Sequence, residues 1–275
     1  INLIPLVTFP NCKINIGLQI LGKRTDGYHN LQSVFLPVPL TDILEIIPAP
    51  ASQQFSFSQT GIFIPGDVNE NICIKAYRLL KEKYNLPPVH IHLHKIIPTG
   101  GGLGGGSSNG AHTLMLLNTV FNLQLSENEL LDFALKLGSD CPFFIKNKPC
   151  FVSGRGEHLE PIHLDLSQYK IVIVNPGISV STAAMFGKIS AYKKGIQLID
   201  AIQCSPEHWQ ESITNDFEHV VFPLYPALKM IKEKLYTTGA LYASLSGSGS
   251  TVYGIFEKRA DTKNVDFPPC SVYQF

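Results

Sequence analysis

The sequence predicts an α+β fold. Apolar and polar residues alternate in residues 11–50, as in half-buried strands, whereas helix-like segments with an apolar stripe follow from residue 71. Strands and helices are then mixed without the regular β-α-β count of a doubly wound sheet. The chain has 275 residues, 44% of them hydrophobic, and a domain usually contains about 100–200 residues. We therefore expect two domains, residues 1–158 and 159–275.

The first strands are predicted at residues 13–20 and 42–46, where the alternation is clearest. Residues 23–30 lie between them, are strongly polar and include the turn signal Asp26-Gly27. This segment is expected to be an exposed loop.

Helix signals appear in the middle of the chain. Residues 71–84 have apolar residues at helical spacing and are followed by Pro87-Pro88, so the helix should end before the prolines. Residues 89–97 then predict a strand. A further helix is expected at residues 111–121, with a side chain from Ser107, Ser108 or Asn109 capping its first amides.

A capping box, Ser126-Glu127-Asn128-Glu129, predicts the start of another helix, which should end near Gly138. Gly154-Arg155-Gly156 predicts a hairpin turn. Beyond this turn, strands are expected at residues 170–174, 241–245 and 251–256, and helices at residues 181–189 and 225–236.

The composition narrows the function. The 22 basic and 22 acidic residues balance, so no long-range field favours nucleic acid or an anionic membrane as a partner. The six cysteines form no C-x-x-C pair, which favours reduced thiols over a zinc cluster or a disulfide framework. We see no signal-peptide pattern, and every apolar stretch is shorter than the roughly 18 residues of a membrane span. A soluble cytoplasmic protein is expected.

The most informative feature is a glycine-rich loop, Gly100–Gly106, with six glycines in seven positions between a predicted strand and a predicted helix. Such a run costs backbone entropy and permits close approach to a ligand. Amides at a helix N-terminus can surround phosphate oxygens, and Ser107-Ser108 adds hydroxyls where a metal–nucleotide complex would lie. The loop therefore predicts a phosphate site; the alternative is a flexible linker or a tight turn.

Two other phosphate motifs match by spacing only. The loop also satisfies G-x-G-x-x-G, but Pro98 interrupts the strand-to-turn step and no acidic residue closes a second strand about 20 residues later. Gly17–Lys23 satisfies G-x-x-x-x-G-K, but Arg24 replaces the required Ser or Thr. A dinucleotide site and a P-loop are therefore both disfavoured.

A histidine pattern lies on the strand before the loop, where His90, His92 and His94 alternate on one face. An H-x-H pair on a strand can ligate a metal, but no acidic or cysteine cluster nearby completes a coordination shell. We favour a solvated strand face and assign no metal ligand.

The order of these motifs resembles that of the GHMP kinases, a superfamily of small-molecule kinases whose ATP loop reads P-x-x-x-G-L-G-S-S. The loop of this chain has two extra glycines between Leu-Gly and Ser-Ser. In this it resembles the loop of one branch of the superfamily, which acts on a cytidine diphosphate-linked methylerythritol. Departures from that branch are Cys12 for alanine, Gly17 for a bulkier residue and Ser250 for proline. The resemblance covers about residues 10–257 and rests on Pro10–Asn15, Lys23–His29, Pro98–Ser108, Gly138–Phe144, Asn215–Glu218 and Ser246–Thr251.

The resemblance implies a two-domain GHMP kinase fold, with an N-terminal domain like ribosomal protein S5 and a ferredoxin-like C-terminal domain. It also implies phosphorylation of the 2-hydroxyl of the methylerythritol acceptor by ATP with Mg²⁺, in the non-mevalonate route to isoprenoid precursors. Asp140 would be the general base, and Lys13 would stabilise the charge that develops on the transferring group.

The resemblance further implies which residues bind the ligands. Tyr28 would stack on the cytosine, His29 would read its polar edge, and Asn15, Thr182 and Phe186 would complete the acceptor site. The ATP site would comprise Pro98, Thr99, Gly100, Gly101, Gly102, Leu103, Gly104, Gly105, Gly106, Ser107, Ser108, Asn109, Asn71 and Lys95.

Alternatives remain at this point. One alternative is another GHMP kinase, such as homoserine or mevalonate kinase. Tyr28-His29 argues against it, because the substrates of those kinases have no base to stack on these side chains. A nucleotide-binding regulator without turnover, or a Rossmann-type binder, belongs to a different class, and Lys13 and Asp140 favour the enzyme over both. The expected partner is a small molecule, and the protein is expected to be a monomer or a homodimer.

Overall fold

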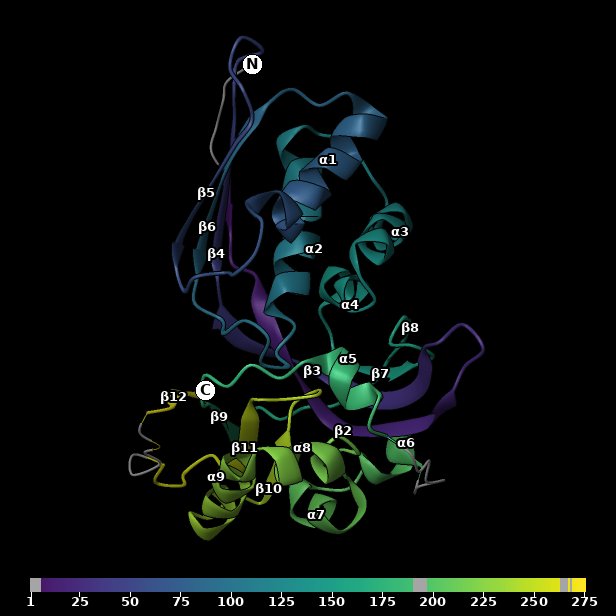
Figure 1. Ribbon diagram of the computed structural model, residues 1–275, viewed down its shortest axis with the longest axis vertical. Helices are drawn as coiled ribbons and strands as arrows, with labels where there is room; N and C mark the ends of the chain where they lie inside the picture. Colours follow the sequence, from purple (N-terminus) through teal and green to yellow (C-terminus); the bar gives the residue numbers. More distant parts are fainter. Residues whose placement is uncertain (1–5, 190–196, 263–266, 268) are drawn as a thin grey trace. The chain divides into compact units, whose positions relative to one another are not determined.

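The computed structural model describes residues 6–189, 197–262, 267 and 269–275. The chain forms two compact units that interleave along the sequence. Unit 1 contains Ile1–Cys12, Pro39–Thr99 and Gly104–Asn147, and unit 2 contains Lys13–Val38, Gly100–Leu103 and Lys148–Phe275. Both units combine strands with helices (Figure 1), which confirms the expected α+β class. The predicted domain boundary between residues 158 and 159 stays a prediction.

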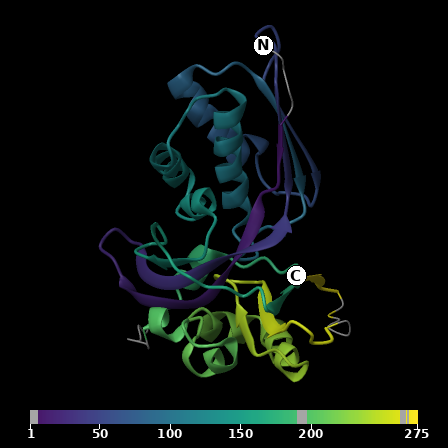
Figure 2. The same ribbon diagram turned by 180° about the vertical axis from the view of Figure 1, so that it is seen from behind.

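Unit 1 is a sheet with helices against one face, as Figures 1 and 2 show from opposite sides. Its strands are β1 (Leu6–Thr8), β4 (Ile43–Pro48), β6 (Val89–Lys95) and β5 (Ser56–Gly61), in that order across the sheet. Only the β5–β6 pairing is parallel among these neighbours. The helices are α1 (Ile72–Tyr84), α2 (Gly105–Val120), α3 (Glu127–Leu137) and α4 (Cys141–Lys146), and a 3-10 turn, η1 (Val68–Glu70), precedes α1.

The core of unit 1 follows from the period of its strands. Leu44 and Ile46 of β4 and Ile91 and Leu93 of β6 alternate with more exposed residues, so their side chains gather on the face toward the helices. Residues of α2 such as Leu117 pack against them. This packing fixes the strand that enters the glycine loop and the helix that leaves it.

Local capping accounts for the starts of two helices whose presence the sequence predicted. The Asn71 side chain accepts a hydrogen bond from the Cys73 amide at the start of α1, which ends before the prolines. Ser126 and Glu129 form the expected capping box of α3. The structure confirms a helix over the predicted residues 111–120, but the predicted start and cap of α2 were wrong: it begins at Gly105, and its N-cap is Gly104, in a left-handed conformation with no side-chain cap. Residues 107–109 therefore lie inside the helix.

The three histidines of β6 face the hydroxyls of β5. Ser56 Oγ lies 2.5 Å from His90 Nδ1, Ser58 Oγ lies 2.8 Å from His92 Nδ1, and Thr60 Oγ1 lies 2.8 Å from His94 Nδ1. Among the residues with described positions, no three His, Cys, Asp or Glu side chains gather as a metal site would require. The histidines form a partly exposed polar ladder along the strand.

Unit 2 contains two sheets. One has the order β2 (Asn11–Lys23), β3 (His29–Thr41), β7 (Cys150–Ser153) and β8 (His158–Pro161); β2 and β3 begin or end in residues assigned to unit 1. The other has the order β10 (Tyr242–Leu245), β11 (Val252–Glu257), β9 (Tyr169–Asn175) and β12 (Ser271–Gln274). The predicted exposed loop over residues 23–30 is shorter than expected, because β2 extends to Lys23 and β3 starts at His29, which is buried.

Short helices complete unit 2. The helix predicted at residues 225–236 is α9, and the one predicted at residues 181–189 is confined to α5, with residue 190 outside the described part. Val174 of β9, Ala243 of β10 and Leu235 of α9 belong to one buried cluster. The helical elements are α5 (Thr182–Phe186), α6 (Leu198–Ala201), η2 (Pro206–His208), α7 (Trp209–Ser212), α8 (Glu218–Leu224) and α9 (Pro226–Thr237).

The six cysteines all lie in the described part of the chain and are free thiols. No helix in the described ranges has the length and apolar character needed to cross a bilayer.

Candidate active site

The glycine loop opens a long helix, as the sequence predicts. The 16-residue helix α2 starts directly after Gly104, so the unpaired amides of its first turn face away from the helix body. Ser108 is fully buried in that turn, and its hydroxyl has no hydrogen-bond partner among the described residues. Unpaired amides and an unpartnered hydroxyl at a helix N-terminus fit the phosphate oxygens of a nucleotide.

The tip of the loop, Gly100–Leu103, is assigned to unit 2 and is held there by hydrogen bonds. The Lys13 amide donates to the Leu103 carbonyl at 2.9 Å, and the Thr251 amide donates to the Gly101 carbonyl at 3.2 Å. The Ser246 hydroxyl donates to the Gly102 carbonyl at 2.8 Å. This part of the loop is therefore a fixed structure rather than the flexible linker that was the alternative.

Lys95 is one of the predicted ATP residues, and the structure places its ammonium group beside the carboxylate of Asp42. The pair is 2.5 Å apart, and both side chains are almost fully buried. Burial lowers the pKa of Lys95, and the negative charge of Asp42 opposes that shift. Asp42 also accepts a hydrogen bond from the predicted ATP residue Asn109, at 2.8 Å. Lys95 and Asn109 are thus brought together by an acid that sequence reasoning missed.

Asp42 holds both flanks of the glycine loop. Its Oδ1 accepts hydrogen bonds from the amides of Ile96 and Ile97, at 2.7 and 2.8 Å, just before the loop. Asn109, just after the loop, completes the set. The signal in the sequence was an acid at the junction of two apolar strand segments, between the end of β3 at Thr41 and the start of β4 at Ile43.

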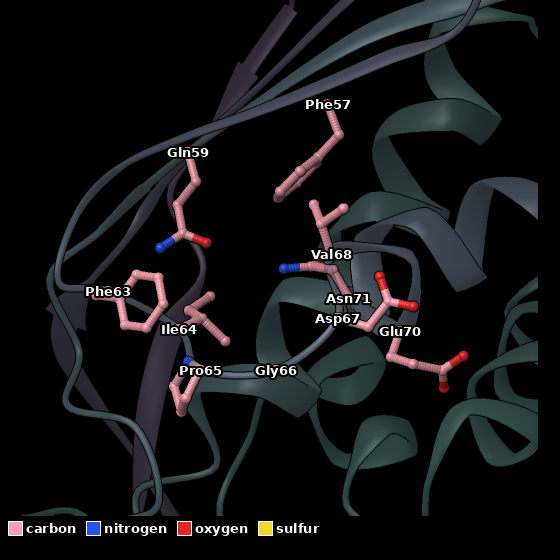
Figure 3. A pocket seen from close by; sticks show the side chains of 10 residues that line it. All are labelled: Phe57, Gln59, Phe63, Ile64, Pro65, Gly66, Asp67, Val68, Glu70 and Asn71. Carbon is pink, nitrogen blue, oxygen red and sulfur yellow. The ribbon is translucent and has the colours of Figure 1, made fainter.

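Asn71, a predicted ATP residue outside the glycine loop, lines a pocket of about 370 Å³. Figure 3 shows side chains of β5, including Phe57 and Gln59, on one side of this pocket and the η1 segment with Val68 on the other. The segment between them carries Phe63, which is 76% exposed. The other polar side chains of the lining are the carboxylates of Asp67 and Glu70. Apolar and aromatic walls with a few polar groups fit a planar base.

Lys13 and Asn15 lie together in β2. The Lys13 ammonium donates to Asn15 Oδ1 at 2.6 Å and lies 4.3 Å from the centre of the Phe35 ring. Asn15 Nδ2 donates to Ser33 Oγ at 2.9 Å. The Lys13 side chain is buried although an alternating strand would ordinarily expose it, which is unusual for a lysine and typical of a functional one.

The predicted base-binding residues are also partly assembled in unit 2. The rings of His29 and Phe186 stack with 4.9 Å between centres and 15° between planes. Burial lowers the pKa of His29, and the positive charge of Lys23 contributes. Tyr28 is 55% exposed, and the Arg155 guanidinium lies 4.8 Å from its ring centre. The structure thus places Arg155 against the Tyr28 ring, whereas the sequence indicated only that Arg155 lies in a hairpin turn.

Thr182, the remaining predicted acceptor residue, shares a hydrogen bond of 2.7 Å with Ser248 Oγ. Ser248 belongs to the Ser246–Gly249 loop, so this predicted acceptor residue meets the same loop that holds the glycine-loop tip.

Asp140 lies in unit 1, between α3 and α4. It occupies the N-cap position of α4, but its side chain makes no capping hydrogen bond there. The neighbouring Cys141 is buried, and burial raises the pKa of its thiol to about 12. Cys141 therefore remains a neutral thiol at physiological pH. Lys13 and Asp140 belong to different units.

Comparisons with known proteins identify the family of this chain. The chain matches the sequence profiles of the GHMP kinases N terminal domain over residues 71–148 and of the GHMP kinases C terminal domain over residues 199–265. It is 48% identical over 263 residues to the 4-diphosphocytidyl-2-C-methyl-D-erythritol kinase of Bacteroides thetaiotaomicron, covering 95% of this chain and 96% of the relative. Identity to the protein of the same name from Bacteroides fragilis is 46% over 270 residues, covering 98% of each chain.

A solved structure supports the same grouping. The crystal structure of a 4-(cytidine 5′-diphospho)-2C-methyl-D-erythritol kinase matches with a TM-score of 0.78 and 28% identity, covering 91% of this chain and 90% of that one. The fold and the glycine loop thus define an ATP-dependent small-molecule kinase of the GHMP class. Within that class, the chain belongs to the 4-diphosphocytidyl-2-C-methyl-D-erythritol kinase family.

Proposed function

We propose that this enzyme transfers the γ-phosphoryl group of ATP to the 2-hydroxyl of 4-diphosphocytidyl-2-C-methyl-D-erythritol, in the non-mevalonate pathway to isoprenoid precursors. The observation that carries the proposal is the aromatic set of unit 2, in which His29 stacks on Phe186 and Tyr28 is exposed. Such a set fits a pyrimidine base. Homoserine and mevalonate present no base, so the set favours the cytidyl acceptor over those of the related kinases.

The donor side of the proposal lies in unit 1. The pocket beside Asn71 has the size and aromatic lining for the adenine, and the first turn of α2 offers amides and the Ser108 hydroxyl to the phosphates. Bound ATP supplies the phosphoryl group and a good leaving group. Lys95 would have two roles: it pairs with Asp42, which holds the flanks of the glycine loop, and it would lie near the phosphates.

Mg²⁺ belongs to the proposal because phosphoryl transfer requires charge neutralisation. The described residues offer no cluster of three His, Cys, Asp or Glu side chains. In kinases Mg²⁺ is usually bound through substrate phosphates, water and one or two carboxylates, and we propose that phosphate oxygens and water fill most of its coordination sites here.

The chemical step is assigned to Asp140 and Lys13. Asp140 would accept the proton of the acceptor hydroxyl, and Lys13 would stabilise the negative charge that develops as the phosphoryl group moves. Asn15 accepts a hydrogen bond from the Lys13 ammonium at 2.6 Å and would contact the acceptor. Thr182, bound to Ser248, would contact the acceptor from α5.

The cellular setting is also part of the proposal. Free thiols at all six cysteines suit a reducing compartment such as the cytoplasm. A small-molecule substrate needs no macromolecular partner, so a monomer or a homodimer without nucleic acid is proposed.

A coupled assay of ADP release tests the function. Purified protein with ATP and Mg²⁺ is given the cytidyl acceptor, homoserine or mevalonate in separate reactions. We expect ADP release with the cytidyl acceptor only. Turnover of homoserine or mevalonate at a comparable kcat/KM would replace the proposed substrate, and ATP binding without ADP release would support the regulator.

A further inference from the structure

The segment Asn215–Glu218, which the family resemblance marked without giving it a role, binds the strand that carries Lys13. The Leu18 amide donates to the Thr214 carbonyl at 3.0 Å, and the Asp216 amide donates to the Leu18 carbonyl at 2.8 Å. Asp216 Oδ2 accepts a hydrogen bond from the Ile20 amide at 2.7 Å. The segment is therefore fixed along β2.

The side chain of Asn215, within this segment, is directed toward the end of β10. Its side-chain amide donates at 2.8 Å to the carbonyl of Leu245 and at 2.8 Å to the carbonyl of Gly247. Its Oδ1 accepts a hydrogen bond from the Phe217 amide at 3.0 Å. Asn215 is only 1% exposed, so loss of its amide would leave two buried carbonyls without these donors.

Glu218 supports the same turn from the next helix. Its Oε1 accepts hydrogen bonds from the Leu245 amide at 2.9 Å and from Ser244 Oγ at 3.1 Å. Lys232 of α9 pairs with its Oε2 at 2.6 Å. Asn215 and Glu218 together hold the backbone of Leu245–Gly247.

The Ser246 hydroxyl connects the Leu245–Gly247 backbone to the glycine loop and to β2. It donates to the Gly102 carbonyl at 2.8 Å and accepts a hydrogen bond from the Asn15 amide at 3.3 Å. An added Cβ at Gly102 would lie 1.9 Å from the Ser246 carbonyl oxygen, so the two backbones are in direct contact. A shift of Ser246 would therefore move the loop tip and the Asn15 backbone together.

We propose that Asn215 is a positioning residue, which holds Ser246 so that the tip of the ATP loop and the strand bearing Lys13 and Asn15 are aligned for transfer. The inference rests on the proposed function, since it takes Gly100–Leu103 as part of the donor site and Asn15 as part of the acceptor site. Asn215 itself is too deeply buried to touch substrate.

Steady-state kinetics of Asn215→Ala, Ser246→Ala and the double variant test this role. Because misplacement of reacting groups by about 1 Å can cost about 10²-fold, we expect each single variant to lower kcat by about 10–100-fold, with both KM values changed by less than about threefold. The double variant should be little worse than either single one, because both break the same connection. Ser246→Ala removes one hydroxyl and keeps the test open if Asn215→Ala does not fold.

Asn118→Ala is the matched control. Asn118 also bridges backbone groups with its side chain, accepting from the Leu125 amide at 3.0 Å, but it lies at the end of α2 in unit 1, away from the loop. It should lower the melting temperature without changing kcat per folded molecule. If Asn215→Ala behaves in the same way, Asn215 is structural only and the inference is overturned.

Hydrogen exchange separates this inference from the proposed function. In the wild type and in Asn215→Ala, exchange is followed in peptides that cover residues 98–106. Faster exchange in the variant supports the positioning role of Asn215, even if the cytidyl acceptor proves not to be the substrate. Unchanged exchange in this region overturns it whatever the substrate is.

Discussion

The buried pair of Asp42 and Lys95 gives a quantitative test of how the glycine loop is held. Asp42→Asn keeps the shape of the side chain but removes its charge, leaving the buried Lys95 ammonium without its counter-ion. Breaking one partner of a buried ion pair typically costs about 3–5 kcal/mol. This is a large part of the roughly 5–15 kcal/mol that stabilises a typical protein. We expect Asp42→Asn to lower the free energy of unfolding by about 4 kcal/mol.

Urea unfolding at pH 7 without ligand measures this effect separately from ATP binding. The double variant Asp42→Asn/Lys95→Met removes both charges, so it should recover most of the loss and give a coupling energy of about 3 kcal/mol. The control is Glu233→Gln, which breaks an exposed pair with Lys229 at 3.6 Å and should cost less than about 1 kcal/mol. The reasoning is refuted if Asp42→Asn costs no more than this control, or if Lys95→Met does not rescue it.

Three further predictions concern the chemistry, the acceptor and the response to pH. Asp140→Asn and Lys13→Ala should each lower kcat by at least about 10²-fold in the coupled assay while circular dichroism remains that of the wild type; a near-normal rate for either would remove its assigned role. Tyr28→Ala should raise KM for the cytidyl acceptor by about 5–150-fold, because stacking on a base contributes about 1–3 kcal/mol; an unchanged KM would place the base elsewhere. Burial lowers the pKa of His112 from 6.5 to about 4, so the unfolded chain binds a proton in this range that the folded chain does not, and stability falls as pH falls. Between pH 7 and pH 5, His112→Gln should therefore lose about 2 kcal/mol less than the wild type in urea unfolding; equal losses would contradict the shift.

Local signals account for what the sequence predicted well. Asn71 and Ser126 cap α1 and α3 through bonds to residues two or three positions away, which a short window contains. The start of α2 lacked such a signal, because its glycines have poor helix propensity and its stability comes from burial of residues such as Leu114 and Leu117.

Long-range contacts account for what the sequence did not predict. His29 has polar neighbours in sequence, yet Phe186 covers it in the fold. Asp42 and Asn215 find their partners far along the chain, at Asn109 and Gly247. Most of the residues assigned to the candidate site came from resemblance, and their roles in binding and catalysis stay predictions.

The glycines of the loop differ in what requires them. At Gly102 the backbone has a φ of +77°, and an added Cβ would lie 1.9 Å from the Ser246 carbonyl oxygen, so the fold itself excludes a larger residue. At Gly106, apart from its chain neighbours and the nearby backbone of its own helix, no atom of the described residues lies within 4 Å of an added Cβ. Because alanine is favoured over glycine inside a helix by about 1 kcal/mol, Gly106→Ala should keep or raise stability.

Gly106→Ala can therefore separate the ligand's requirement from that of the fold. If the first turn of α2 holds the phosphates, its added methyl group should raise KM for ATP by about tenfold or more, through loss of close backbone approach. Gly102→Ala should instead lower the melting temperature before any ligand is added. A stable Gly106→Ala enzyme with the wild-type KM for ATP would show that the phosphates do not approach this turn, and the glycine at that position would then have no explanation in either the fold or the donor site.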